Sequence, residues 1–215
     1  MSTPVKVFVI GRPGSGKSTA VHRIIELAMK TGYSTKRLKE YEILFQMFQE
    51  DTDHKKFSPT EHGGFDVLDF SVLDTALEKL KRRVCELVNS TKKELLLIEF
   101  ARDDYSKALN HLGYDFLQDA YFLFIDADIE TCIQRIYKRI TCMTRVDNHY
   151  VSEDIIRSYY SKDNKPYMAG TFKIKMGEQR VQVIENNVSL DEFIERIDRF
   201  ATSFLTKEVG EALLV

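Results

Sequence analysis

The chain has 215 residues and a formal net charge of -2, from 31 lysines and arginines against 33 aspartates and glutamates. This length suits one α/β domain with a large buried core, and the near-neutral charge excludes the positive excess typical of nucleic-acid proteins. No apolar run reaches membrane-spanning length, and the cysteines Cys85, Cys132 and Cys142 form no paired or metal-ligand motif. We expect a soluble, single-domain protein of the reducing cytosol, without nucleic-acid or membrane partners, in which Cys85 and Cys132 are core residues.

The chain begins with a β-rich apolar run over residues 5–10, followed by a glycine-rich turn and by apolar residues at helical spacing. The turn satisfies G-x-x-x-x-G-K-[ST], the phosphate-binding P-loop, with Gly11, Gly16, Lys17 and Ser18. In such a loop the glycines let backbone N–H groups surround an anion at the positive end of the next helix. The lysine reaches the β- and γ-phosphates, and the hydroxyl holds Mg²⁺. An ordinary glycine turn does not explain Lys17 and Ser18 at the helix start, so we expect nucleotide binding.

Residues 33–70 have less regular patterns than the segments around them. Residues 33–40 are charged and weakly patterned, which is compatible with a second strand or with a turn. Residues 41–49 are apolar enough for a buried helix. Residues 51–66 lose periodicity and contain proline and two glycines, which predicts a long loop, either functional or a plain surface connection. We assign residues 33–70 to the acceptor side of the domain.

The middle of the chain alternates helices with strands. Residues 71–88 carry an apolar helical stripe. Residues 94–100 form a continuous apolar run, which is typical of a central parallel strand covered by helices on both faces. A short helix over residues 106–112 ends at Gly113, and residues 120–125 predict the next strand.

The last third of the chain continues this alternation. An apolar helical pattern over residues 129–140 leads into the polar segment 141–150, and Ser152 caps a further helix. Residues 181–184 predict a last strand, before an amphipathic helix that ends near residue 205. Alternating elements imply right-handed crossovers. The expected fold is therefore a three-layer α/β/α P-loop fold with a mostly parallel five-stranded sheet and a short helical lid at about residues 139–152.

Ligands of such sheets bind at the carboxyl ends of the strands, where Glu99 and Arg102 stand. A carboxylate there either holds the magnesium shell or accepts a proton from an acceptor hydroxyl. The alternative for Glu99 is a structural salt bridge, and we favour the functional interpretation. Arg102 has the bidentate geometry to grip a phosphate or carboxylate and so to orient the acceptor.

Arginines cluster before the polar segment. Arg135 and Arg139 are spaced by four and share a helix face, and Arg145 follows within the segment. Phosphoryl transfer needs such cations, because charge on the moving group must be neutralised. We expect Arg139 and Arg145 to close over the phosphates from the lid, and leave Arg135 open between this role and solvent-facing pairs.

Four blocks of the chain resemble P-loop small-molecule kinases of the adenylate kinase-like group. Residues 11–19 resemble its G-x-P-G-x-G-K-[GST]-T loop, and residues 124–139 its strand, acid and arginine helix before the lid. Residues 145–160 are similar to its arginine–acid pair and helix after the lid. Residues 183–192 resemble its last strand and the loop that packs against adenine, which implies cofactor contacts for Asn186 and Asn187.

The chain also departs from that group. Nucleoside monophosphate kinases of the group usually carry Asp-Gly-x-Pro-Arg after the central strand, where this chain has Glu-Phe-Ala-Arg-Asp at residues 99–103. A glutamate in this slot is more similar to nucleoside kinases, in which it serves as base for a hydroxyl acceptor. The lid lacks four cysteines, so no structural zinc is expected, and residues 33–70 match no substrate pattern of the group.

We therefore expect an ATP- and Mg²⁺-dependent phosphotransferase acting on a nucleoside or nucleoside monophosphate. The alternatives are a kinase of a sugar, sugar acid or other polar metabolite, or a P-loop ATPase or nucleotide-dependent switch acting through a protein partner. The catalytic candidates are Lys17, Glu99, Arg102, Arg139 and Arg145. The cofactor-binding candidates are Gly11, Arg12, Pro13, Gly14, Ser15, Gly16, Lys17, Ser18, Thr19, Asn186 and Asn187. The metal candidates are Ser18 and Glu99.

Overall fold

A five-stranded sheet forms the centre of the computed structural model, which describes residues 4–88, 93–141 and 150–206. The strand order is β2-β5-β1-β6-β7, and every neighbouring pair is parallel, as expected from the sequence. The strands are β1 (Val5–Ile10), β2 (Ser34–Lys39), β5 (Glu94–Phe100), β6 (Tyr121–Asp126) and β7 (Val181–Glu185). The segment at residues 33–40, compatible with a strand or a turn, is an edge strand, and its polar sequence fits that exposed position.

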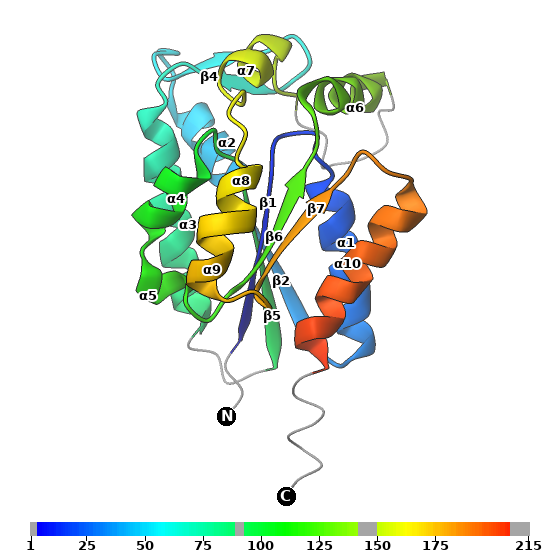
Figure 1. Cartoon of the computed structure of the whole chain (residues 1–215). Coiled ribbons are helices and arrows are strands. Elements are labelled where there is room, and N and C mark those ends of the chain that lie inside the picture. Colours follow the sequence, from blue (N-terminus) through cyan, green and yellow to red (C-terminus); the bar gives the residue numbers. More distant parts are fainter. Residues whose placement is uncertain (1–3, 89–92, 142–149, 207–215) are drawn as a thin grey trace, which may run out of the picture.

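Helices cover both faces of this sheet (Figure 1). Helices α1 (Lys17–Lys30) and α10 (Leu190–Leu205) cover one face. The other face is covered by α2 (Glu40–Glu50), α3 (Ser71–Val88), α4 (Tyr105–Leu112), α5 (Tyr114–Leu117) and the run of α8 (Lys165–Tyr167), η1 (Met168–Phe172) and α9 (Lys173–Met176). The expected three-layer α/β/α fold is confirmed.

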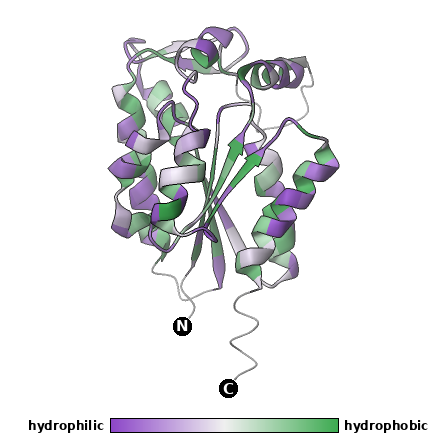
Figure 2. Cartoon of the chain, viewed as in Figure 1, coloured by the Kyte–Doolittle hydropathy of each residue, from purple (hydrophilic) through white to green (hydrophobic). Residues whose placement is uncertain are grey.

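Alternation along β1 explains how one strand serves two cores. Phe8 and Ile10 pack into the cluster beneath α3 and α4, whereas Val7 and Val9 pack beneath α1 and α10. All seven residues of β5 are buried. The central strands are accordingly hydrophobic along their length, and the helices turn hydrophilic residues outward (Figure 2).

Two further helices and a small hairpin lie over the carboxyl ends of the strands (Figure 1). They are α6 (Ile129–Thr141), α7 (Glu153–Ser158) and the antiparallel pair β3 (Phe57–Pro59) and β4 (Phe65–Val67). The prediction of a long loop over residues 51–66 is therefore wrong in part. Phe57 and Phe65 pack edge to face at 5.3 Å and hold the hairpin, but three-residue strands are too short to show alternation.

The cysteine prediction is confirmed for one residue and wrong for another. Cys132 is buried, but Cys85 is exposed, because it lies on the outward side of α3. Cys142 lies outside the described residues. Within the described ranges, no helix has both the length and the apolar character needed to cross a bilayer.

Candidate active site

The P-loop joins β1 to α1 and is wedged between two other elements. A Cβ at Gly14, where φ is 82°, would lie 2.5 Å from the carbonyl oxygen of Cys132 on α6. A Cβ at Gly16, where φ is 110°, would lie 2.4 Å from Nδ2 of Asn186. Both contacts and both φ angles require glycine, so the glycines that the motif supplies also allow close packing around the loop.

Lys17 curls back over the loop that it serves. Its Nζ donates hydrogen bonds to the carbonyl oxygens of Gly11 at 2.7 Å and Arg12 at 2.8 Å. Burial lowers the pKa of Lys17 to about 8, although the nearby carboxylate of Glu99 opposes that shift. The ammonium is therefore held by carbonyl oxygens of the P-loop, within the motif that predicts phosphate binding.

Arg12, an expected cofactor contact, instead holds the loop to its surroundings. Its guanidinium donates to the carbonyl oxygens of Tyr160 at 2.8 Å, Lys162 at 2.7 Å and Ala127 at 3.1 Å. It also lies 3.4 Å from Asp126 Oδ1. Thr19 is exposed in the first turn of α1. The side chain of Arg12 thus anchors the loop to neighbouring segments, and Thr19 follows the loop in α1.

Ser18 and Glu99 come together through a third residue. Arg37, on β2, forms a two-pronged ion pair with Glu99, in which Nη2 lies 3.2 Å from Oε2. The same Nη2 donates to Ser18 Oγ at 3.2 Å. The hydroxyl and the carboxylate, our two metal candidates, therefore point at one position, where a positive group stands.

Arg102 is only 4% exposed and is paired with Glu40, itself 2% exposed. It also donates to the carbonyl oxygens of Leu73 and of Ala101. Glu40 lines the cleft but Arg102 does not. In this arrangement Arg102 supports Glu40 at the wall of the cleft and does not itself line it.

On the lid side, Arg139 lines the cleft from α6. Arg135 donates to the carbonyl oxygens of Asn186 at 2.8 Å and Ser15 at 3.4 Å, so it braces the P-loop. Arg145 lies outside the described residues, as does most of the expected lid. The end of that lid contacts the hairpin, because the backbone N–H of Ser152 donates to Asp66 Oδ1 at 3.1 Å.

The two asparagines after β7 differ in their surroundings. Asn186 is buried, and its Nδ2 donates to the carbonyl oxygen of Ser15 at 2.7 Å. Its backbone N–H donates to the carbonyl oxygen of Asp126 at 2.7 Å, which ties β7 to β6. Asn187 is exposed. Of this expected adenine-side pair, only Asn186 touches the P-loop.

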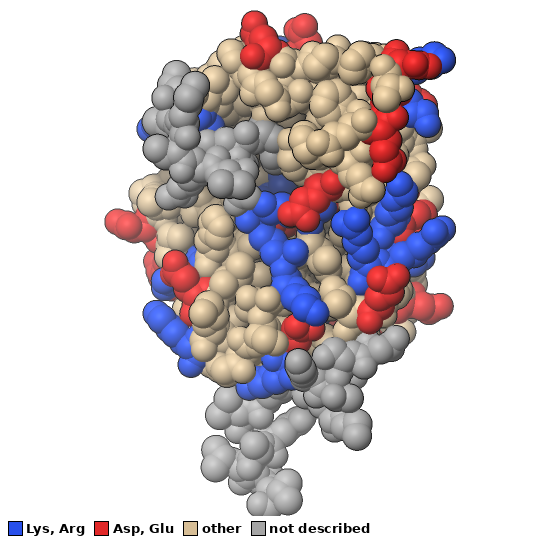
Figure 3. All heavy atoms as spheres, turned by 180° about the vertical axis from the view of Figure 1, so that it is seen from behind, with Lys and Arg blue, Asp and Glu red and all other residues tan. Residues whose placement is uncertain are grey.

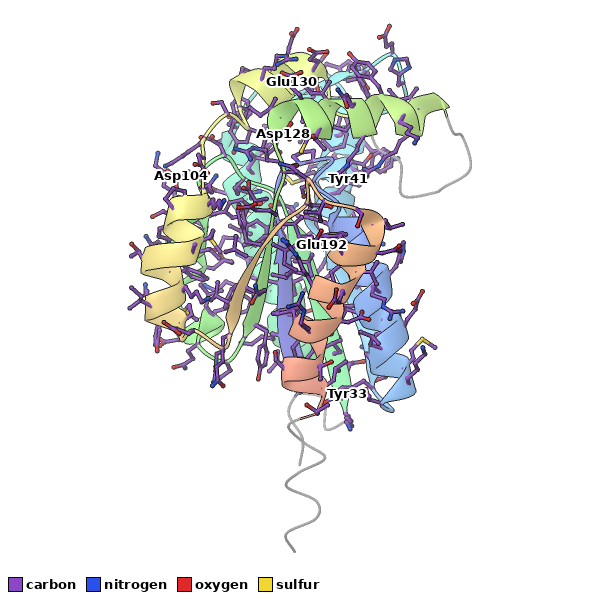
Figure 4. The ribbon with its side chains drawn as sticks, turned by 45° about the vertical axis from the view of Figure 1, so that its right-hand side comes forward. Tyr33, Tyr41, Asp104, Asp128, Glu130 and Glu192 are labelled. Atoms are coloured by element: carbon purple, nitrogen blue, oxygen red, sulfur yellow. The ribbon has the colours of Figure 1, made fainter. Side chains whose placement is uncertain are left out.

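A cleft of about 1010 Å³, part of it open to solvent, runs from the P-loop to the hairpin. Its phosphate end is lined by Pro13, Gly14, Gly16, Lys17, Ser18, Arg37, Glu99 and Arg139. Its far end is mainly apolar and aromatic, with Tyr41, Leu44, Phe65, Val67, Phe70, Leu73, Phe100, Val151, Ile155, Tyr159 and Tyr160. The rings of Tyr41 and Phe65 stack there at 5.5 Å with 10° between their planes. Figure 4 shows that Tyr41 lies at the end of the sheet covered by α6, whereas Tyr33, before β2, lies at the opposite end.

Lysine and arginine side chains gather on one face of the molecule. The face opposite to the view of Figure 1 carries a band of lysine and arginine side chains across its middle (Figure 3). Edge strand β2 carries Lys36, Arg37 and Lys39, and of these Arg37 and Lys39 line the cleft. Such a field attracts anionic ligands such as nucleotides.

Sequence reasoning missed several residues of the site. Arg37, Glu40 and Tyr41 fall in residues 33–70, which match no substrate pattern. Contacts with Glu99, Arg102 and Phe65, respectively, place them in the site. Tyr105 was missed too, and its hydroxyl accepts a hydrogen bond from the backbone N–H of Gly11 at 2.8 Å. A hydroxyl six residues after Glu99, at the start of a helix, gives no signal in the sequence.

The described residues contain no group of three or more histidines, cysteines or carboxylates that could enclose a metal. Mg²⁺ does not require such a cage, because it is usually held by one or two protein groups together with phosphates and water. Ser18 Oγ and Glu99 Oε2 converge on one position and are both oxygen donors. The residues present therefore fit Mg²⁺ bound together with a nucleotide.

No protein-family model matches the chain. Human adenylate kinase isoenzyme 1 is 30% identical over 168 residues, which cover 76% of this chain and 78% of that protein. UMP-CMP kinase from Gallus gallus is 27% identical over 204 residues, which cover 90% of this chain and 95% of that protein.

Solved structures share the architecture at lower identity. APS kinase from Mycobacterium tuberculosis superposes with a TM-score of 0.58 at 15% identity, covering 93% of this chain and 98% of that one. A gluconokinase from Sinorhizobium meliloti gives a TM-score of 0.54 at 15% identity, covering 98% of this chain and 99% of that one. At this identity the likeness establishes the fold alone.

Proposed function

The chain belongs to the adenylate kinase family and is a small-molecule kinase, and on that premise we propose that it transfers the γ-phosphoryl group of ATP to a nucleoside or a nucleoside monophosphate. One observation carries the proposal. Lys17, Ser18 and Glu99 meet at one end of a cleft whose other end is lined by aromatic and apolar side chains. The first end suits phosphates and the second suits a flat ring.

The P-loop residues have distinct roles in this proposal. Backbone N–H groups between Gly14 and Thr19 surround the phosphates, and Lys17 exchanges its two carbonyl partners for phosphate oxygens. Ser18 and Glu99 would hold Mg²⁺, which supplies charge neutralisation at the phosphates when bound. Arg139 on α6 and Arg145, later in the chain, neutralise negative charge on the phosphoryl group during its transfer.

The acceptor end depends on residues 33–70. Tyr41 and Phe65 offer stacked ring faces. Glu99 lies at the phosphate end of the cleft, where a carboxylate serves either the metal or the acceptor hydroxyl. Arg102 is a positioning residue in this scheme, because it holds Glu40 at the wall of the cleft. Residues 139–152 act as the lid of a single P-loop domain. The enzyme uses ATP and Mg²⁺ and works in the cytosol.

The test is ADP formation from Mg²⁺-ATP in the presence of pooled nucleosides, nucleoside monophosphates, sugars or sugar acids. We expect transfer to one of the first two pools. Lys17→Met should lower kcat/KM by at least about a hundredfold, since a group that stabilises transferring charge is lost. Lys30→Met, on the exposed last turn of the same helix, should leave kcat/KM unchanged.

Transfer to sugars or sugar acids would replace the proposed acceptor class while keeping the kinase. ATP hydrolysis that no pool changes would contradict the proposal and favour a nucleotide-dependent switch. A phosphorylated product, identified by mass, separates transfer from hydrolysis in either case.

A further inference from the structure

Arg37 stands where the P-loop hydroxyl and the strand-end carboxylate converge. Its Nη2 lies 3.2 Å from Ser18 Oγ and 3.2 Å from Glu99 Oε2, and its Nε donates to the other carboxylate oxygen. The side chains of Arg37 and Glu99 are 16% and 8% exposed. A positive group is thus enclosed at this position by three oxygen atoms.

The register of the sheet explains how Arg37 reaches this position. β2 is parallel to β5, with Arg37 opposite Leu97 and Lys39 opposite Glu99. Side chains two residues apart share a face of a strand, so Arg37 and Glu99 lie on the same face of the sheet. Its length lets the arginine side chain cover the offset between the two pairs.

We propose that Arg37 occupies the cation position of the nucleotide site, so that its guanidinium and a divalent cation compete for Ser18 and Glu99. The inference rests on the proposed function in one respect, which is that these two residues are the protein ligands of the metal. The Arg37 guanidinium and a divalent cation cannot both bind the same oxygen atoms of Ser18 and Glu99, because like charges this close repel strongly. Metal binding therefore requires Arg37 to leave Glu99.

The charges at the site explain why Arg37 pairs with Glu99 without nucleotide and why a divalent cation replaces it when nucleotide is bound. Without nucleotide, Arg37 supplies the counter-charge that the nearly buried Glu99 needs, since an unpaired buried carboxylate is strongly unfavourable. With nucleotide, the phosphates bring negative charge that both cations can share. Arg37 also lines the cleft, so a displaced guanidinium remains at the site with its donors available to phosphate or acceptor oxygens. Nucleotide-free protein should consequently bind divalent cations weakly.

The experiment measures Mn²⁺ binding to nucleotide-free protein from the electron paramagnetic resonance signal of free Mn²⁺. Arg37→Gln should lower the Kd for Mn²⁺ by about fivefold or more, in the range typical of coupling between two sites. Lys36→Gln is the matched control, because Lys36 lies next to Arg37 on β2 but pairs with Glu94. The control should change the Kd by less than about twofold. An Arg37→Gln protein that binds Mn²⁺ no more tightly than the natural chain would overturn the inference.

Two further variants make the test specific. The double variant Arg37→Gln/Glu99→Gln should lose the increase in Mn²⁺ affinity. An increase that persists would place the ion elsewhere and overturn the inference. Arg37→Lys keeps the charge but cannot bridge both partners, so it should also bind Mn²⁺ more tightly than the natural chain. An unchanged Kd in that variant counts against the inference even if Arg37→Gln fails to fold.

The metal readout is independent of phosphoryl transfer. A protein that shows the Mn²⁺ gain but transfers phosphate to none of the pooled acceptors contradicts the proposed function only. A protein that transfers phosphate but shows no gain contradicts the role of Arg37 only.

Discussion

The rings of Phe70 and Tyr159 stack at 4.3 Å with 6° between their planes. Phe70 directly precedes α3, and Tyr159 directly follows α7, so the pair joins the acceptor side of the domain to the segment after the lid. Both rings line the cleft. The stack therefore closes one side of the space in which an acceptor would be held.

Phe70→Ala should raise the KM for the acceptor by about two- to tenfold, because an aromatic pair contributes about 0.5–1.5 kcal/mol beyond its buried area. The Kd for an ATP analogue should stay within about twofold, since the two rings belong to the apolar end of the cleft. Steady-state kinetics with the identified acceptor and calorimetry with the analogue check both values. Leu68→Ala is the control, because Leu68 is 56% exposed and lies outside the cleft. A lower kcat at unchanged acceptor KM would show that the stack serves the chemical step instead.

Removing Arg102 should destabilise the protein. Arg102→Met leaves Glu40 buried without its partner, and breaking such a pair costs about 3–5 kcal/mol in the free energy of unfolding. Urea denaturation measures the loss, and the double variant Glu40→Gln/Arg102→Met should recover part of it. A fall in kcat with an unchanged midpoint of unfolding would instead assign Arg102 directly to the acceptor.

Most of the fold follows from local sequence patterns. The continuous apolar run at residues 94–100 predicts a central strand, and all seven residues of β5 are buried. Ser152 predicts a helix start, and its hydroxyl accepts the expected backbone hydrogen bond; Ser189 caps α10 in the same way. Such signals can be read because they depend on neighbours within a few residues.

The missing parts of the site depend on distant neighbours. Arg37 and Glu99 are separated by 62 positions, as are Glu40 and Arg102. Nothing in the local pattern of residues 33–40 reveals these partners, because an edge strand has a polar sequence. The phosphate end of the cleft is thus predictable from a motif, whereas the acceptor end emerges only when β2 pairs with β5.

Nucleotide binding should take up protons in mildly alkaline solution. The pKa of Lys17 is lowered to about 8 by burial, so the free ammonium is partly deprotonated above that pH, and bound phosphates should raise this pKa. Calorimetry at about pH 9 in two buffers of different ionisation enthalpy measures the uptake. Lys17→Met should abolish it, and equal apparent enthalpies in the two buffers for the natural chain would refute the prediction.

The lowered pKa of Lys17 also makes the free energy of unfolding depend on pH. Between the folded pKa of about 8 and the unfolded value of 10.5, the unfolded chain binds more protons than the folded one. The contribution of Lys17 to the free energy of unfolding therefore rises with pH across this window. Below the window, the folded state bears the full cost of burying the charged lysine. The difference in stability between the natural chain and Lys17→Met, followed by urea denaturation against pH, should shift toward the natural chain on the alkaline side.

The two described cysteines should differ in thiol reactivity. Cys85 is exposed on α3, whereas Cys132 is buried and its pKa is raised to about 11 by that burial. Because the thiolate is the reactive form, Ellman's reagent should modify one thiol quickly in a Cys142→Ser background and a second only after unfolding. Rapid modification of two thiols in the native protein would show that α6 opens readily above the P-loop.

The buried and the exposed asparagine after β7 should contribute unequally to nucleotide affinity. Asn186→Ala removes the hydrogen bond to Ser15 and leaves a buried carbonyl without that donor, which costs about 1–3 kcal/mol at the loop. We expect the Kd for an ATP analogue to rise by about tenfold, while Asn187→Ala, which alters an exposed side chain, changes it less than about twofold. Calorimetric titration of both variants checks the difference. If Asn187→Ala weakens binding as much as Asn186→Ala, the exposed asparagine contacts the nucleotide itself, and support of the P-loop does not explain the affinity.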